Sequence, residues 1–448
     1  VDDKRNNMSI RAAAGEQLDW SFGLRNGAGK YLTAETFNYR IATAASIMKK
    51  KQIWFLEQED GEDHVYIKSH LNRFLYVDGD GNFKGDSEEK TDEAQLLIEA
   101  QDDGRWALKS KKYGWYLGND PSIERAAFEA DKQEKHMWTV HLAMHPQVCL
   151  RNVNRRAYVH LQDNQLCTDE LIPWGDDATI TMHFFTEDGT YGLVSSEGSF
   201  LSASGALMAE PNDSCKFIIV FNGGKVSFKS KSSGKFLTAL GAKGTCKATK
   251  SAISKDELFY MEDSFPQIKL TANNGKKCSI KAGIELSASQ TETTDLEIFQ
   301  IEPQGKVGDD VWSIKGCNGK FWSVVDGAIH SSADEVKGDN EKFKIEWRGP
   351  RIAIQSCANG KYLEQKLNGY IHAIGAEASE EGKTEYVYEI VNRPKLVLRG
   401  EYGFVGTLPS GLLECNKSVP EVYTMHIAKG LCHVSHANGK YWKVGDNG

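Results

Sequence analysis

The chain has no cysteine in its first 148 residues and no long apolar run. Its 448 residues include nine cysteines, the first of them Cys149, and no two are closely spaced. A secreted domain held together by disulfides has a different pattern, so we expect a reducing compartment, the cytoplasm. No apolar run approaches the roughly 20 residues of a membrane-spanning helix, and residues 1–17 lack the apolar centre of a signal peptide. We therefore expect no membrane insertion.

The short motifs of common catalytic and metal sites are also missing. The sequence has no Cys-x-x-Cys, no His-Glu-x-x-His and no Gly-x-Ser-x-Gly. Residues 78–82 resemble the start of a calcium loop, but Phe83 stands where that loop needs glycine. We expect no enzyme activity, no cofactor and no metal.

The chain also has no excess of positive charge. The chain carries 54 Lys and Arg against 62 Asp and Glu, a net charge of −8. A chain with this balance is not drawn as a whole to nucleic acid or to an anionic membrane. An acidic partner would have to meet a local cluster of basic residues.

What the sequence does have is a repeated motif. A glycine or polar residue is followed in most copies by a basic residue, then an aromatic residue and an aliphatic or aromatic one, as in Gly-Lys-Tyr-Leu at 29–32. The third residues of the eleven copies are Tyr31, Phe74, Tyr116, Tyr158, Phe200, Phe236, Cys278, Phe321, Tyr362, Phe404 and Tyr441. The intervals between them run from 36 to 43 residues. Such even spacing indicates one structural unit for each copy.

The pattern between the motifs predicts β-strands. Residues 65–69 and 225–229 alternate between apolar and polar side chains, which is typical of half-buried strands. An Asn-Gly-Gly turn links 217–220 to 225–229, so we expect a hairpin there, and a similar one over 343–354. Units of about 41 residues with four short strands fit a propeller blade or a β-trefoil lobe. Eleven units exceed the usual four to eight blades, which disfavours the propeller.

Several longer segments resemble the fascins, the family of proteins that cross-link actin filaments. They occur in the family's order along the whole chain, at residues 22–24, 29–35, 49–54, 56–58, 102–106, 143–148, 255–259, 392–394 and 399–401. The resemblance implies an all-β fold of four tandem β-trefoils, or twelve lobes. Eleven units then correspond to three complete trefoils and about two of the three lobes of a fourth. We expect a fragment or a truncated product.

The domain boundaries follow from this grouping. We expect a flexible N-terminal tail at 1–18 and trefoils at 19–145, 146–266 and 267–391, with the partial fourth trefoil at 392–448. The resemblance also implies a monomer that binds and bundles F-actin, as part of the cytoskeleton of actin-rich cell projections.

The fascin resemblance implies a filament-binding cleft between the first and fourth trefoils. Residues that match the family there are Lys30, Lys49, Lys51, Arg399 and Glu401. Two consecutive basic residues of the family pattern are replaced by Leu408 and Pro409, which removes two positive charges. If residues 49–51 form a strand, Lys49 and Lys51 share one face.

Two further sites follow from the resemblance. A regulatory serine of the family falls at Ile47 here, and the preceding Ser46 is the candidate for phosphorylation in its place. A phosphate would add about −1.5 to −2 charges beside the lysines and oppose docking. A cross-linker needs a second basic surface, for which the candidates are Lys247, Lys250, Lys255, Lys281 and Lys366.

The alternative is a carbohydrate-binding β-trefoil, a lectin. Residues 52–54 read Gln-Ile-Trp, a Gln-x-Trp triplet typical of lectin trefoils, but it occurs once rather than in most lobes.

Overall fold

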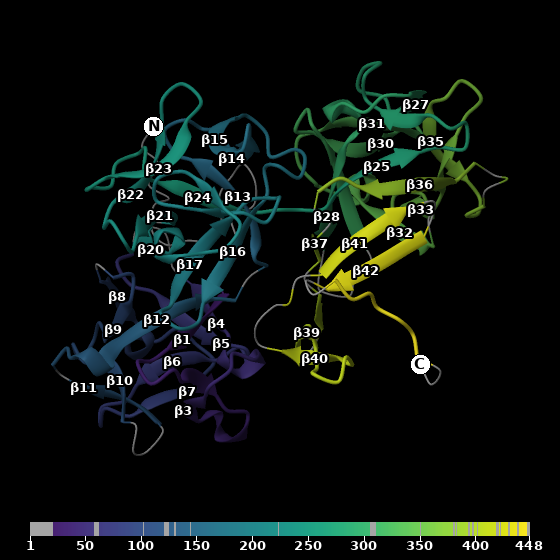
Figure 1. Cartoon of the computed structure of the whole chain (residues 1–448). Helices are drawn as coiled ribbons and strands as arrows, with labels where there is room; N and C mark the ends of the chain where they lie inside the picture. Colours follow the sequence, from purple (N-terminus) through teal and green to yellow (C-terminus); the bar gives the residue numbers. More distant parts are fainter. Residues whose placement is uncertain are drawn as a thin grey trace. The chain divides into compact units, whose positions relative to one another are not determined.

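The chain is described by a computed structural model (Figure 1). It describes residues 21–445 apart from 58–61, 102, 121–124, 130, 144, 223, 305–310, 350, 380, 382, 393–394, 397, 401, 418–420, 422, 429–430 and 437–438. The predicted tail at 1–18 lies outside these residues. Within them the only helices are 3-10 turns of three residues, and the rest of the regular structure is β, as predicted. These turns are η1 (Phe37–Tyr39), η2 (Lys50–Gln52), η3 (Asp92–Ala94), η4 (Glu134–His136), η5 (Asp213–Cys215), η6 (Asp295–Glu297) and η7 (Asp339–Glu341).

The first twelve strands form one sheet, which we call trefoil 1. They are β1 (Ser21–Arg25), β2 (Tyr31–Ala34), β3 (Ile41–Ala45), β4 (Trp54–Glu57), β5 (Tyr66–Ser69), β6 (Phe74–Val77), β7 (Phe83–Ser87), β8 (Leu96–Ala100), β9 (Trp106–Ser110), β10 (Tyr116–Asp120), β11 (Arg125–Glu129) and β12 (Met137–Leu142).

The next twelve strands form trefoil 2. They are β13 (Gln147–Asn152), β14 (Tyr158–Gln162), β15 (Gln165–Glu170), β16 (Ile180–Phe185), β17 (Thr190–Val194), β18 (Phe200–Leu201), β19 (Leu207–Met208), β20 (Phe217–Asn222), β21 (Lys225–Ser230), β22 (Phe236–Leu240), β23 (Thr245–Lys250) and β24 (Phe259–Asp263). The hairpin predicted around residues 217–229 is β20–β21, in which Asn222 pairs with Lys225.

A third set of twelve strands forms trefoil 3. They are β25 (Gln267–Thr271), β26 (Lys277–Ser279), β27 (Ser287–Gln290), β28 (Phe299–Gln304), β29 (Val311–Gly316), β30 (Phe321–Val325), β31 (Ala328–Ala333), β32 (Phe343–Arg348), β33 (Arg351–Ser356), β34 (Tyr362–Gln365), β35 (Ile371–Gly375) and β36 (Glu385–Ile390). The predicted hairpin over 343–354 is β32–β33.

Six strands close into a barrel in each of these three sheets, which defines the β-trefoil. In trefoil 2 each barrel strand pairs with the next, in the order β13, β16, β17, β20, β21 and β24, and β24 pairs back with β13. Trefoil 3 closes in the same way from β25 to β36. In trefoil 1 the isolated bridge between Val65 and Leu96 completes the ring between β5 and β8. Three hairpins attach to each barrel, such as β2–β3, β6–β7 and β10–β11 in trefoil 1.

The repeated motif is the start of the first strand of each hairpin. Gly29, two residues before Tyr31, has a φ of 76°, a left-handed conformation that glycine adopts without steric cost. Tyr31 then begins β2, and Leu32 points into the core with no exposed surface. A register shift follows the aromatic residue, as it does after Phe236 and Phe321. The motif therefore encodes a turn, a β-bulge and a buried anchor.

The seventh copy of the motif lies one residue earlier in the structure than the sequence pattern predicts. Its glycine with positive φ is Gly275, strand β26 begins at Lys277, and the register shift falls between Lys277 and Cys278. Lys277 is therefore the counterpart of the aromatic residue. Cys278, with no exposed surface, is the counterpart of the buried aliphatic one. A lysine at an aromatic position hid this register from the sequence pattern.

Trefoils 1 and 2 share one hydrophobic core that runs from Phe22 to Met261. At their junction the rings of Trp106 and Phe221 meet edge to face with centroids 5.1 Å apart. The Tyr191 hydroxyl accepts a hydrogen bond of 3.0 Å from the backbone nitrogen of Leu142. These contacts join the two trefoils into one compact unit, which also includes residues 397–421. Trefoil 3 has its own core around Trp322 and belongs to a second compact unit.

The region after residue 390 contains six described strands rather than twelve. In the first compact unit, β38 (Arg399–Gly400), β39 (Gly403–Thr407) and β40 (Leu413–Lys417) form a three-stranded sheet. In the second unit, β37 (Lys395–Leu396), β41 (Tyr423–Ala428) and β42 (Leu431–His436) form another. The domain boundaries predicted from the repeats remain a prediction. None of the described helices is long or apolar enough to span a membrane.

Candidate basic site

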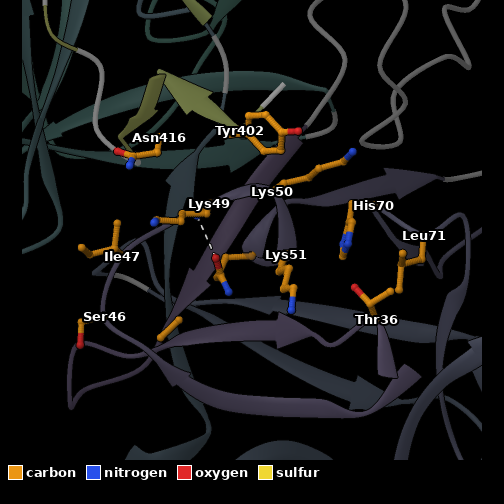
Figure 2. Close-up of a pocket in the computed structure, with 12 residues that line it drawn as sticks. Thr36, Ser46, Ile47, Lys49, Lys50, Lys51, His70, Leu71, Tyr402 and Asn416 are labelled. Carbon is orange, nitrogen blue, oxygen red and sulfur yellow. Dashed lines mark hydrogen bonds between the residues drawn. The ribbon is translucent and has the colours of Figure 1, made fainter. Parts of the chain in front are cut away.

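The three consecutive lysines lie on a 3-10 turn. Lys50 and Lys51 are part of η2 and Lys49 is its N-terminal cap, so the strand that the sequence analysis assumed at 49–51 is wrong. The turn forms because Gln52 accepts a hydrogen bond of 2.8 Å from the backbone nitrogen of Lys49. Since successive residues of a 3-10 turn point in different directions, the three ammonium groups diverge instead of sharing a face (Figure 2).

Gln52 is a structural residue. Its side chain is 5% exposed, and its Nε2 donates a hydrogen bond of 3.0 Å to Thr33 Oγ1. Glu257 and Glu297 hold the equivalent place in other lobes, where each accepts from a backbone nitrogen and from a hydroxyl group. Trp54 is fully buried and donates to Leu32 O. The Gln-x-Trp triplet therefore holds the lobe together, and neither side chain is available to a sugar.

A cavity of about 920 Å³ opens beside this turn. Strand β3 and the loop after it contribute Ala45, Ser46 and Ile47, and Thr36 lies nearby. The turn itself contributes its three lysines and Gln52. The other lining residues, shown in Figure 2, are His70, Leu71, Tyr402 and Asn416. None of the twelve lining residues is acidic.

The charges around the cavity are only partly neutralised. Lys51 Nζ lies 2.8 Å from Glu35 Oε2, in an ion pair with both side chains partly exposed. The pKa of Glu414 is lowered mainly by its hydrogen bond from Lys417, with a further contribution from the nearby Lys49 ammonium. Among the described residues, the Lys50 ammonium has no ion pair. The cavity therefore presents net positive charge.

His70 is the one titratable lining residue that is not a lysine or a tyrosine. Its burial lowers its pKa below the ordinary value, and the ammonium groups of Lys50 and Lys51 lower it further, while Glu35 opposes them. The Nδ1 atom of His70 is buried and has no hydrogen-bond partner among the described residues. His70 is therefore mainly neutral in the cavity wall, and its Nδ1 makes no hydrogen bond to the described residues.

Comparisons with known proteins place this geometry in a family. The model of the fascin domain matches residues 28–140, 148–261 and 273–388. Fascin-2 of Bos taurus is 35% identical over 440 residues, which are 96% of this chain and 87% of that protein. Fascin of Strongylocentrotus purpuratus is 31% identical over 96% of this chain and 88% of its own length. Fascin-3 of Mus musculus is 24% identical over 95% of this chain and 85% of its own length.

This chain belongs to the fascin family. Fascins are structural proteins that bundle actin filaments, and similarity over nearly the whole chain supports that function and does not favour the lectin alternative. Among solved structures, "SeviL bound to asialo-GM1 saccharide" matches 28% of this chain and 99% of its own, at 17% identity and a TM-score of 0.26. Similarity at that level carries no inference about function.

Three of the five residues assigned to the fascin filament-binding cleft lie at the cavity or next to it. Lys49 and Lys51 line it, and Lys30 Nζ donates a hydrogen bond of 2.9 Å to Ser46 Oγ on its rim. The backbone of Arg399 pairs with Phe404 in the sheet that carries Tyr402, but its side chain lies outside the described part. Glu401 is outside the described residues altogether.

Lys30 repeats a contact found in another fascin lobe. Lys235, which also precedes the aromatic residue of its motif, donates to the Ser251 hydroxyl 16 residues further on, just as Lys30 does to Ser46. This contact ties the beginning of a hairpin to the loop that follows it. Lys30 thus has a structural role, and its contact with the phosphorylation candidate Ser46 is a consequence of the repeat.

The two replaced basic positions of the family pattern lie in a turn. Leu408 is half-buried and Pro409 is exposed, directly after β39, and the backbone nitrogen of Leu408 donates to Leu412 O. Neither residue lines the cavity.

The five candidates for a second surface divide between the two compact units. Lys247 and Lys250 lie on β23, and Lys255 precedes β24, all in the first unit. Lys281 follows β26 and Lys366 follows β34 in the second unit. Lys250, Lys255 and Lys281 are exposed, whereas Lys247 and Lys366 are partly covered. Lys247 packs beside Gly205, where an added Cβ would lie 2.7 Å from its side chain.

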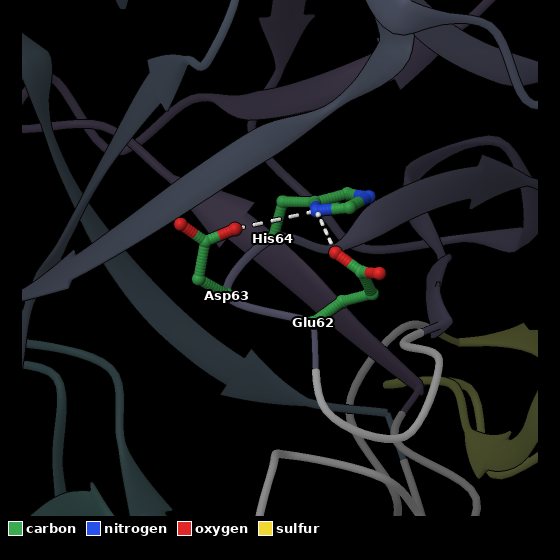
Figure 3. Close-up of side chains that lie close together, drawn as sticks. All are labelled: Glu62, Asp63 and His64. Atoms are coloured by element: carbon green, nitrogen blue, oxygen red, sulfur yellow. Dashed lines mark hydrogen bonds and ion pairs between the residues drawn. The ribbon is translucent and has the colours of Figure 1, made fainter.

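A separate cluster of Glu62, Asp63 and His64 has side-chain atoms close enough to hold a metal ion (Figure 3). However, Lys111 Nζ lies 2.6 Å from Asp63 Oδ1 and 3.2 Å from His64 Nδ1. The ammonium group takes the place of a cation and neutralises one of the two carboxylates, so we interpret the cluster as an ion-pair network.

The cavity-wall residues that sequence reasoning missed include His70, Leu71, Tyr402 and Asn416. His70 and Leu71 follow β5, Tyr402 precedes β39 and Asn416 lies on β40, and no motif marks them. Only the folded chain brings them together.

Proposed function

We propose that this chain binds F-actin through the surface around η2, with Lys49 and Lys51 in contact with the filament. The observation that supports this is three lysines on one turn beside a cavity with no acidic lining residue, in a chain of net charge −8. An actin filament is an acidic surface, and concentrated positive charge accelerates association and sets the register of docking.

Bundling needs a second surface on the same molecule. We propose that Lys247, Lys250, Lys255, Lys281 and Lys366 supply it, that the molecule acts as a monomer, and that it works as a structural cross-linker rather than as an enzyme. The shared core of trefoils 1 and 2 supports this mechanism for Lys247, Lys250 and Lys255, because a stiff unit holds these lysines at a fixed distance from η2. We further propose actin-rich cell projections as its location.

Actin co-sedimentation at two speeds tests the proposal. High-speed pelleting measures binding and low-speed pelleting measures bundling. The double variant Lys49→Glu and Lys51→Glu should lose about tenfold in affinity, from about 0.7 kcal/mol for each reversed charge. It should also weaken the salt dependence of binding.

The matched control is Lys337→Glu, which reverses an exposed lysine that is ion-paired with Glu335. The proposal fails if the double variant pellets like the control. Loss of low-speed pelleting with binding retained in Lys247→Glu and Lys250→Glu would identify the second surface. Sedimentation velocity checks the monomer, since a dimer could bundle filaments with one surface per chain.

A further inference from the structure

The cavity beside η2 has the volume of a small-molecule site. At about 920 Å³ it falls within the roughly 300–1,000 Å³ of ligand pockets in proteins. A filament surface can contact exposed lysine side chains without filling such a hollow. The cavity therefore calls for an explanation beyond filament docking.

The chemistry of the wall selects the ligand. Of the three ammonium groups on this turn, only that of Lys51 has an ion pair among the described residues, and those of Lys49 and Lys50 have none. Because Glu35 already pairs with Lys51, two positive charges remain, which one carboxylate cannot balance, whereas a phosphate group carries about −1.5 to −2. Ammonium groups are common binders of phosphate.

The remaining wall suits a hydroxylated carbon ring. Ser46 and Thr36 offer hydroxyl groups, and Tyr402 and Asn416 offer a phenol and an amide from the β38–β40 segment. Ile47 and Leu71 add apolar surface. The buried Nδ1 of His70, which has no hydrogen-bond partner in the part of the chain that the structure describes, is a polar atom that a bound ligand could satisfy.

We infer that this cavity binds a compact polyol or sugar bearing at least two phosphate groups, with Lys50 and His70 among its contacts, and that the bound ligand competes with the filament. The competition rests on the proposed function, because Lys49 and Lys51 serve both surfaces. The same chemistry occurs in a soluble polyol phosphate and in the head group of an inositol lipid.

Titration calorimetry with inositol trisphosphate tests the binding without actin. The wild-type chain should bind it and should not bind unphosphorylated inositol. Lys50→Met should weaken binding more than tenfold through loss of a charged hydrogen bond, and His70→Gln about fivefold. Lys337→Met removes an equally exposed charge elsewhere and should change nothing.

Proton uptake adds a readout specific to His70. Burial lowers the pKa of His70 most, and the charged groups that shift it further are Lys50 and Lys51, which lower it, and Glu35, which raises it. A bound phosphate offsets the two lysines, so His70 should take up part of a proton on binding. Calorimetry in two buffers of different ionisation enthalpy measures the net exchange of protons, to which the ligand's phosphate groups also contribute, so the contribution of His70 is the difference between the wild type and His70→Gln. Absence of binding to the wild type, or equal affinity in Lys50→Met, overturns the inference.

Two further experiments identify the source of the ligand and distinguish this inference from the proposed function. Vesicles of phosphatidylcholine with phosphatidylinositol bisphosphate should retain the chain if the lipid head group enters the cavity, and binding of the soluble compound alone would limit the ligand to the free form. In actin co-sedimentation, inositol trisphosphate should release the wild-type chain. Binding without release would refute the competition and leave the cavity site standing. Normal lysine-dependent pelleting without any anion binding would refute the site and leave the proposed function standing.

Discussion

The hydroxyl of Tyr31 lies 2.9 Å from Nδ1 of His141. The His141 ring stacks on Phe184 of trefoil 2, with ring centroids 3.9 Å apart and an angle of 15° between the planes. The aromatic residue of the first repeat thus reaches the junction between two trefoils through a single histidine. His141 is 3% exposed, and its burial lowers its pKa to about 3, with the Arg25 guanidinium as a smaller cause in the same direction.

The pKa of His141 makes the folded state sensitive to acid. The unfolded chain binds a proton at the ordinary pKa of about 6.5, whereas the folded chain does not until about pH 3. Stability is therefore full above pH 6.5 and falls by about 1.4 kcal/mol for each pH unit between these values. Urea unfolding of the wild type at pH 5 should show about 2 kcal/mol lost from this group relative to pH 7.5.

Two variants isolate that effect. His141→Gln should be less stable at pH 7.5 because the stacked ring is gone, but it should lose about 2 kcal/mol less on acidification than the wild type. Tyr31→Phe keeps the histidine and should keep the wild-type pH dependence. A pH dependence unchanged in His141→Gln would show that this residue is not the acid-sensitive group.

The fold was largely predictable because its signals are local. The motif around Tyr31 contains its turn, its strand start and its buried anchor within four residues. The Asn-Gly-Gly turn after Phe221 predicted a hairpin that the structure confirms. Where the local signal was weak, at Lys277, the register was misjudged by one residue.

The candidate site was predictable only in part, because it depends on distant contacts. The lysine run was visible in the sequence, but its 3-10 conformation depends on Gln52, whose side chain binds both Lys49 and Thr33. His70 and Tyr402 join the cavity from positions that no spacing rule connects. A sequence pattern indicates which residues are buried or charged, but it does not indicate which distant segments of the chain come into contact.

The buried tryptophans should differ in their sensitivity to substitution by phenylalanine. Trp54 Nε1 donates to Leu32 O over 2.9 Å, whereas Trp106 Nε1 has no hydrogen-bond partner among the described residues. Both side chains have no exposed surface. Trp54→Phe leaves a buried carbonyl without its donor, so it should cost about 1–2 kcal/mol more than Trp106→Phe in urea unfolding.

A second pair serves as the control for this comparison. Trp138 Nε1 donates to Leu117 O, whereas Trp322 Nε1, like that of Trp106, has no partner within the described part of the chain. Trp138→Phe should follow Trp54→Phe, and Trp322→Phe should follow Trp106→Phe. Equal losses for all four would mean that volume, and not the hydrogen bond, decides the cost.

Gln52 should tolerate glutamate but not leucine. Glutamate occupies the equivalent place at Glu257, where it accepts from Thr238 Oγ1 and from the backbone nitrogen of Ser254. Gln52→Glu should therefore change the free energy of unfolding by less than about 1 kcal/mol. Gln52→Leu leaves the nitrogen of Lys49 without its acceptor and should cost about 2–3 kcal/mol. Denaturation by urea measures both, and equal losses would contradict the capping role.

The buried cysteines should resist thiol reagents. Burial raises the pKa of Cys246 and of Cys278 to about 12, and neither has exposed surface. Their thiolate fraction at pH 8 is about a thousandfold below that of an ordinary thiol, so native labelling should be limited by unfolding. Cys317, Cys357 and Cys415 are partly exposed and should react before the buried cysteines. Mass spectrometry of a labelling time course checks the order, and early modification of Cys246 would contradict it.

A negative charge at Ser46 should weaken filament binding through its neighbour. Ser46 Oγ is 2.9 Å from Lys30 Nζ, and Ser46 lines the same cavity as Lys49. In Ser46→Asp the new carboxylate would pair with Lys30 and reduce the positive charge that faces an acidic filament. The affinity for F-actin in co-sedimentation should therefore fall several-fold at low salt and less at high salt. Ser46→Ala removes the hydrogen bond without adding charge and should bind within about twofold of the wild type. An equal loss in both variants would mean that the hydroxyl's structural contact, rather than charge at this position, controls docking.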